Sequence, residues 1–135
     1  MSVRWEPTEE STLARRLLRS VGSGVLSTMS LELEGYPFGS VTPFALTHQG
    51  NPAIYVSEIA QHTRNMRADA RVCLTVLQDG DEDNPQAAGR VTVVGDAVEL
   101  DGDEAQAVGE RYFRFFPEAR GYAGTHDFRV FQLEP

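Results

Sequence analysis

The chain has 135 residues and an acidic balance of charge, with 20 Asp and Glu residues against 12 arginines and no lysine. A net charge of −8 argues against nucleic acid and anionic membranes as partners. The length predicts a single domain over residues 1–135. No apolar run is long enough to span a bilayer, and Glu6, Glu9 and Glu10 replace the basic and then apolar start of a signal peptide. We therefore expect a cytoplasmic protein that does not associate with membranes.

The first half of the chain predicts a helix followed by strands. Residues 1–7 form a loose lead, and Thr8 or Ser11 can cap a helix that runs to about Val21. Pro43 lies inside one of the predicted strands and marks an edge or a bulge, because proline cannot donate to a ladder. Turn residues separate the predicted strands at 25–29, 38–46 and 53–56.

A short helix and a strand come next. Thr63 is a good N-cap for a helix over 64–68. The strand at 71–77 is apolar on both faces, which suggests a barrel wall covered by a helix or by a second subunit. Residues 78–89 are predicted to be a mobile acidic loop, whose carboxylates lack the spacing of a twelve-residue calcium loop. No metal site is predicted.

The last third predicts a long strand, a helix and a final strand. The long strand covers 90–100, with Gly95 as a bulge. A capping box that begins at Asp103 opens a helix to about Phe115, and the last strand covers 128–133. Hairpin-sized connections join most of these strands, so we predict a mainly antiparallel β-barrel with flanking helices rather than a doubly wound sheet.

Polar side chains gather between Ser57 and Arg71, in the connection that contains the short helix. A helix N-terminus carries unpaired N–H groups and a partial positive charge. Together with Arg64 and the Thr63 hydroxyl, it makes a candidate seat for a phosphate or another anion. The alternative interpretation is a solvated polar connection between a strand and a helix.

Several segments together resemble a known family. They are Phe38–Leu46, Tyr55–Glu58, His62–Met66, Asp69–Arg71, Tyr112–Pro117 with Tyr122, and Asp127–Leu133. These segments resemble the FMN-binding split barrel of the pyridoxamine 5′-phosphate oxidase-like superfamily, and most closely its branch of HugZ-type haem-utilisation proteins. The resemblance implies a homodimer with two FMN sites in grooves between the subunits, acting on a small-molecule substrate that the sequence does not identify.

The resemblance also implies roles for individual residues. Most of the implied cofactor contacts belong to the polar connection, and others come from the second strand through backbone groups that line the isoalloxazine ring. The implied set is Thr63, Arg64 and Asn65 at the phosphate, Ser57 and His62 beside it, Ser40, Val41 and Thr42 at the ring, and Arg90 as a weaker candidate for the same groove. No catalytic residue is implied.

Three functions stay open at this point. The leading expectation is an FMN-dependent oxidoreductase, in which the flavin supplies the chemistry. The first alternative is haem binding or degradation on the same fold, with His62 or His126 as candidate ligands. The longer haem-utilisation relatives continue past the matched segment into a further domain that contributes to haem binding, so haem ranks second. The other alternative is a regulatory dimer without a cofactor.

Overall fold

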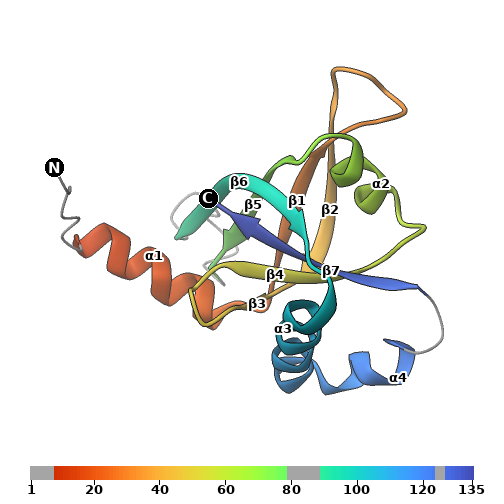
Figure 1. The fold of residues 1–135 in the computed structure, drawn as a ribbon. Coiled ribbons are helices and arrows are strands. Elements are labelled where there is room, and N and C mark those ends of the chain that lie inside the picture. Colours follow the sequence, from red (N-terminus) through yellow and green to blue (C-terminus); the bar gives the residue numbers. More distant parts are fainter. Residues whose placement is uncertain (1–7, 79–88, 124–126) are drawn as a thin grey trace, which may run out of the picture.

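The computed structural model describes residues 8–78, 89–123 and 127–135, without the side chains of residues 122 and 123. The predicted lead, nearly all of the predicted acidic loop and His126 lie outside the described residues. The elements in chain order are α1 (Glu9–Ser20), β1 (Ser23–Met29), β2 (Pro37–Pro43), β3 (Ala45–Leu46), β4 (Pro52–Ser57), α2 (Gln61–Ala68), β5 (Arg71–Leu77), β6 (Arg90–Glu99), α3 (Gly102–Phe115), the 3₁₀ turn η2 (Pro117–Ala119), α4 (Arg120–Ala123) and β7 (Phe128–Glu134) (Figure 1).

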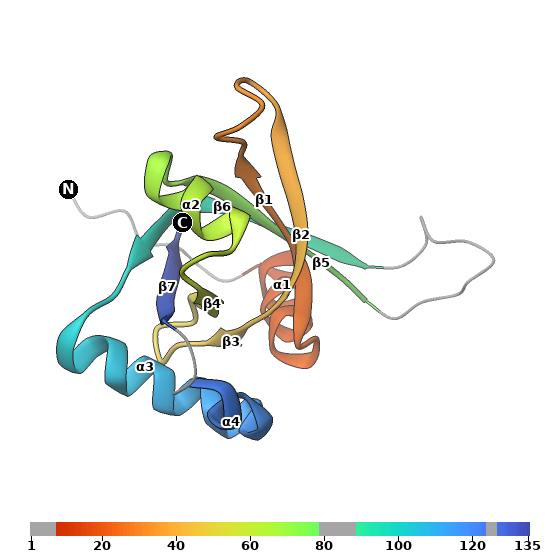
Figure 2. The same cartoon turned by 90° about the vertical axis from the view of Figure 1, so that its right-hand side faces the viewer.

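The strands form one antiparallel sheet of seven strands in the order β2-β1-β5-β6-β7-β4-β3. The long strand β6 joins its two halves, because residues 90–96 pair with β5 and residues 96–99 pair with β7. The sheet curls around its inner face, with α2 at one end and α1 and α3 at the other (Figures 1 and 2). The predicted fold class, an antiparallel split barrel with flanking helices, is confirmed. None of the helices in the described ranges has the length and apolar character needed to cross a membrane.

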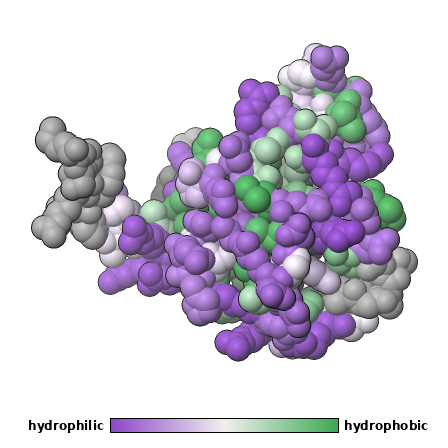
Figure 3. All heavy atoms as spheres, in the orientation of Figure 1, coloured by the Kyte–Doolittle hydropathy of each residue, from purple (hydrophilic) through white to green (hydrophobic). Residues whose placement is uncertain are grey.

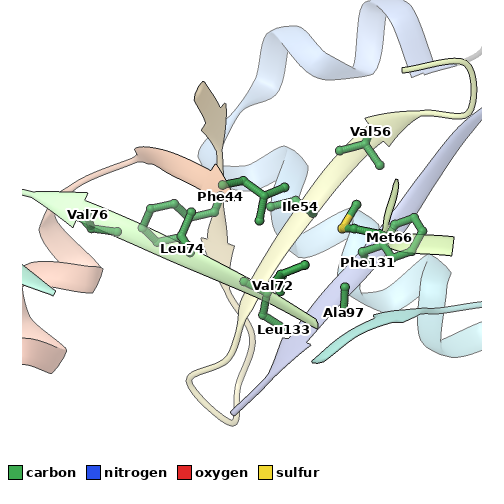
Figure 4. Packing of buried hydrophobic residues seen from close by; sticks show 11 residues of the cluster. Phe44, Ile54, Val56, Met66, Val72, Leu74, Val76, Ala97, Phe131 and Leu133 are labelled. Atoms are coloured by element: carbon green, nitrogen blue, oxygen red, sulfur yellow. The ribbon is translucent and has the colours of Figure 1, made fainter. Parts of the chain in front are cut away.

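The inner face of the sheet forms the main hydrophobic core. Leu26, Ile54, Leu74 and Leu133 are fully buried there. Met66 of α2 points into the same cluster beside Phe131 (Figure 4), so α2 is anchored to the core by an apolar side chain. Burial of a large apolar side chain contributes about 1.5–3 kcal/mol. In the orientation of Figure 1 the molecular surface is mostly hydrophilic, with small apolar areas (Figure 3).

Start and stop signals are reliable at α1 and misleading at α2 and α3. Thr8 caps α1 as predicted, in a reciprocal capping box with Ser11. The predicted N-cap role of Thr63 is wrong, because α2 already begins at Gln61. The helix predicted to open at Asp103 instead begins at Gly102, a glycine with φ of +57°, and no side chain caps it.

The predicted strand over 38–46 is two strands. It breaks at Phe44, so that β2 forms one edge of the sheet and β3 the other. Pro43 ends β2 on that edge, which confirms the edge alternative for this proline. The N–H of Phe44 donates to the carbonyl oxygen of Gly22 at 3.0 Å, which holds the bend beside α1.

Gly95 is not a bulge, because the register of β6 with β5 continues through it without a break. Its role is to permit close contact with β7. A Cβ atom at this position would collide with the carbonyl oxygen of Glu134, a backbone atom that cannot move aside. A glycine is therefore required at position 95, because β7 approaches it closely, and not because an extra residue is inserted in β6.

The middle of the outer face of β2, β1, β5 and β6 carries small, uncharged side chains, whereas Arg71, Arg90 and Asp96 lie on the same face at the ends of β5 and β6. We name this middle part the uncharged face, and its side chains are those of Val25, Ser27, Val41, Cys73, Thr75, Thr92 and Val94. Val41 and Val94 are 76% and 68% exposed. The prediction that the strand at 71–77 is apolar on both faces is explained in part, since one of its faces lies in the core and the other belongs to the uncharged face.

Candidate functional site

The structure brings one pair of predicted site residues into direct contact. Ser40 lies on the inward side of β2 and His62 lies in the first turn of α2, with Ser40 Oγ 3.3 Å from His62 Nδ1. Both side chains are half-buried. Burial lowers the pKa of His62 below its ordinary value, which favours the neutral imidazole near neutral pH. A neutral imidazole can accept a proton or coordinate a metal ion.

Thr63 is turned away from the surface. Its side chain is completely buried, and its hydroxyl donates to the carbonyl oxygen of Ser57 at 2.6 Å. The hydroxyl of Ser57 accepts from the N–H of Ile59 at 3.4 Å. These bonds hold the connection from β4 into α2 and fix where the helix begins.

Asn65 is likewise buried, with 0% of its surface exposed. Its Oδ1 accepts from the N–H of Leu31, and its Nδ2 donates to Thr28 Oγ1, each at 3.0 Å. Because both ends of the amide are used inside the protein, Asn65 fastens α2 to β1 and to the β1–β2 connection. In this arrangement the side chain positions its neighbours.

Arg64, between these two buried residues, faces outward. Its side chain is about half-exposed, and its ion pair with Glu32 is long, at 3.6 Å. The neighbouring Arg67 instead donates to Glu99 at 2.8 Å and to Glu58 at 3.1 Å. Arg64 is therefore the guanidinium of α2 that can exchange a weak internal contact for a carboxylate or phosphate of a ligand.

The predicted ring-lining residues lie along the free edge of β2. Since the N–H of Phe44 donates to Gly22 and antiparallel pairing alternates, the backbone groups of Gly39 and Val41 point away from β1. The Val41 side chain lies outward on the uncharged face, whereas Thr42 is buried and its hydroxyl donates to the Pro43 carbonyl. Backbone groups of this edge can thus meet a ligand, as the resemblance implies.

Arg90 is not brought to this site within the chain. It pairs with Leu77 at the far end of β5 and lines a separate groove beside α1. Its predicted role would need a second subunit. The structure therefore brings six of the predicted residues together around the start of α2. They are Ser40, Ser57, His62, Thr63, Arg64 and Asn65.

Sequence reasoning missed the partners that fix α2, namely Thr28 and the N–H of Leu31. They lie more than thirty positions from Asn65 in the sequence, and no local pattern connects them. A useful signal did exist for the uncharged face, because the strand at 71–77 is apolar on both sides. Across the described ranges, no group of three or more His, Cys, Asp or Glu residues is arranged to hold a metal ion.

Comparison with known families decides the relationship. The family model described as the β-barrel of CREG matches residues 6–135. The chain belongs to the CREG β-barrel family. Membership agrees with the curled antiparallel sheet and with the resemblance to split barrels seen in the sequence.

Relatives of this CREG-type chain include named haem proteins. The chain is 33% identical over 134 residues to the chloroplastic haem oxygenase HOZ of Arabidopsis thaliana, covering 99% of this chain and 40% of the plant protein. It is 28% identical over 114 residues to the haem oxygenase HutZ of Vibrio cholerae, covering 82% of this chain and 64% of HutZ. The chain therefore spans less than two thirds of either relative.

A solved structure supports the same relationship. The haem-binding protein of Mycobacterium smegmatis superposes with a TM-score of 0.81 at 32% identity, over 98% of this chain and 52% of that protein. The resemblance to the HugZ-type branch is confirmed by these relatives. The names of these three relatives refer to haem and not to flavin.

Proposed function

We propose that this protein binds haem at the start of α2, the site formed by Ser40, His62 and Arg64. This proposal reverses the order of the two cofactors expected from the sequence. It is supported by the haem-related names of the relatives and by one observation in the structure. The hydroxyl of Thr63 and the amide of Asn65, which were predicted to hold a flavin phosphate, are both buried and engaged inside the protein.

The half-exposed Arg64 and the half-buried His62 suit haem. A haem presents propionate carboxylates and an iron that accepts imidazole nitrogen. Arg64 would pair with a propionate, for which one half-exposed guanidinium with a weak internal partner is sufficient. His62 would present its Nε2 to the iron while Ser40 contacts its Nδ1. The lowered pKa of His62 favours the neutral ring, which is the form that can coordinate a metal ion. Bound haem supplies one-electron and dioxygen chemistry.

The test is a haemin titration followed by the Soret band, with variants at both residues. We expect His62→Ala to shift or abolish the Soret band of the bound form, and Arg64→Gln to weaken binding roughly tenfold, as loss of one charge-assisted contact predicts. Arg15→Gln, which removes an exposed arginine of α1, is the matched control. The proposal fails if both site variants bind haemin as the wild type does. A Soret change only in His126→Ala would move the ligand to that residue.

Haem degradation is tested on the same complex. Loss of the Soret band after addition of a reductant in air, and its persistence without oxygen, would indicate turnover of the bound haem. A stable Soret band under both conditions would indicate binding without degradation.

FMN remains a second candidate because of the free edge of β2. The backbone N–H and C=O groups of Gly39 and Val41 that point away from β1 can hydrogen-bond a flavin ring. Arg64 can pair with a phosphate as well as with a propionate. Retention of flavin absorbance after desalting, and its loss in Arg64→Ala with the fold intact, would support FMN. A protein that retains neither cofactor would support a regulatory role.

We also propose a homodimer, which the uncharged face supports. In a chain with a net charge of −8, a sheet face whose charged side chains lie only at the ends of β5 and β6, and whose middle leaves Val41 and Val94 largely exposed, is suited to burial against a second copy. The free edge of β2 borders this face, so a second subunit would close the open side of the site. We expect a dimer by light scattering, a monomer for Val41→Glu, and an unchanged dimer for the control Leu13→Glu on α1. A monomeric wild type would contradict this.

A further inference from the structure

A second hollow lies at the opposite end of the sheet from α2. We name it the α1–α3 groove, because α1 and α3 form its walls with β3 between them (Figures 1 and 2). Its volume is about 620 Å³. The walls are largely apolar, and Phe115 stays 58% exposed within them. The apolar lining comes from Leu18, Val21, Phe44, Leu46, Phe115 and Phe116.

The charge of this groove opposes that of the whole protein. Arg19 and Arg111 contribute guanidinium groups, and His48 contributes an imidazole. None of the described lining residues is an aspartate or a glutamate, although acidic residues outnumber arginines by 20 to 12 in the chain. An apolar hollow whose charged lining residues are both arginines favours an anion over a neutral or cationic ligand.

Arg111 is held in place before any ligand arrives. Its Nε donates to the carbonyl oxygen of Leu46 at 2.6 Å, and its guanidinium carbon lies 5.7 Å from the ring centre of Phe115. In the described part of the chain its terminal nitrogens have no hydrogen-bond partner. A fixed, partly buried guanidinium can bind an anion with little loss of side-chain entropy. Arg19, by contrast, is exposed at the last turn of α1, where it can close over an anionic group.

We propose that the α1–α3 groove binds a small amphipathic anion, with its apolar body against Phe115 and Phe116 and its carboxylate between Arg19 and Arg111. A groove of this volume has the size of a small-molecule site. A protein partner would cover about 800 Å² on each side, much of it beyond the groove. The groove shares no residue with the site at the start of α2, so this proposal stands or falls independently of haem binding.

The probe is the fluorescence of 1-anilinonaphthalene-8-sulfonate, an aromatic anion, with decanoate and decanol as competitors of equal chain length. We expect decanoate to displace the probe at least tenfold more effectively than decanol. Charge reversal in Arg19→Glu should weaken both probe and decanoate by tenfold or more. Arg15→Glu, which makes the same change of charge on the outer side of α1, should leave both affinities within twofold of the wild type.

Each remaining outcome decides the proposal. Equal displacement by decanol and decanoate, or an unchanged affinity in Arg19→Glu, would overturn it, as would a wild type that binds no probe. If Arg19→Glu is poorly folded by circular dichroism, Arg19→Gln replaces it, with an expected loss of threefold or more. Arg64→Gln should bind decanoate normally, which separates this groove from the haem site.

Discussion

Replacing Asn65 by alanine should destabilise the protein strongly, although the resemblance to split barrels implies a cofactor contact for this residue. The substitution removes the acceptor of the Leu31 N–H and the donor to Thr28 Oγ1. Thr28 is 1% exposed, and its other contact, to the carbonyl oxygen of Phe38, is long at 3.5 Å. The buried Thr28 hydroxyl therefore loses a partner that water cannot easily replace, whereas the N–H of Leu31, a residue that is 54% exposed, loses a partner that water can replace in part.

The magnitude follows from these two bonds. Each hydrogen bond contributes about 0.5–1.5 kcal/mol net, and a buried group left without a partner costs about 1–3 kcal/mol. For Asn65→Ala we expect a loss of about 2–4 kcal/mol in the free energy of unfolding. With a urea m-value of about 2 kcal/mol/M, the urea midpoint of unfolding should fall by about 1–2 M.

The assay is urea unfolding followed by circular dichroism, at pH 7 and without cofactor. Asn51→Ala is the matched control, since Asn51 lies half-buried in a turn and its side chain makes no hydrogen bond to the rest of the described chain. We expect the control to change stability by less than about 0.5 kcal/mol. An Asn65→Ala variant as stable as this control would refute the positioning role of Asn65.

Three further predictions concern backbone packing and ionisation. Gly95→Ala should cost more than about 3 kcal/mol in urea unfolding, because its Cβ would meet a backbone carbonyl, whereas Gly121→Ala, which meets nothing within 4 Å, should be nearly neutral. The Asp69 carboxyl should titrate with a pKa of about 2 by NMR, because Arg71 donates to it, and should return towards the ordinary value in Arg71→Gln; equal values in both proteins would contradict this. The pKa of His62 should lie below its ordinary value because the side chain is partly buried. The stability that depends on the neutral ring should therefore be fully present above about pH 6.5 and should be lost as the pH falls through the lowered pKa. An NMR titration midpoint at or above 6.5 would argue against this burial.

Local signals in the sequence predict much of the fold. The hydroxyls of Thr8 and Ser11, the proline at 43 and the apolar run at 71–77 each act over a few residues, and each marks a real helix start, sheet edge or strand. These signals are readable because capping, proline geometry and pleating depend on neighbours in the chain.

The errors arise where distant contacts override local preference. The sequence predicts Thr63 as an N-cap, but its hydroxyl donates to the carbonyl oxygen of Ser57 and α2 begins three residues before the predicted start at residue 64. Distant contacts also go unseen, since nothing in the sequence shows the pairing of Asn65 with Thr28 and Leu31. Burial of polar side chains is a property of the folded sheet, and single-sequence patterns do not contain it.

The sequence locates the candidate site as a region, but only in outline. The contact between Ser40 and His62 joins two predicted residues across the fold, whereas Arg90 lies elsewhere in the chain. The α1–α3 groove is not predicted, because its residues come from separate elements that the break at Phe44 brings together.

The most direct test of haem binding is a parallel titration of the purified wild-type protein with haemin and with FMN, each followed by desalting and an absorbance spectrum. We predict a retained Soret band at up to one haem per chain and little or no retained flavin absorbance. Retained flavin bands with no Soret band would contradict haem binding and restore FMN as the cofactor of the site.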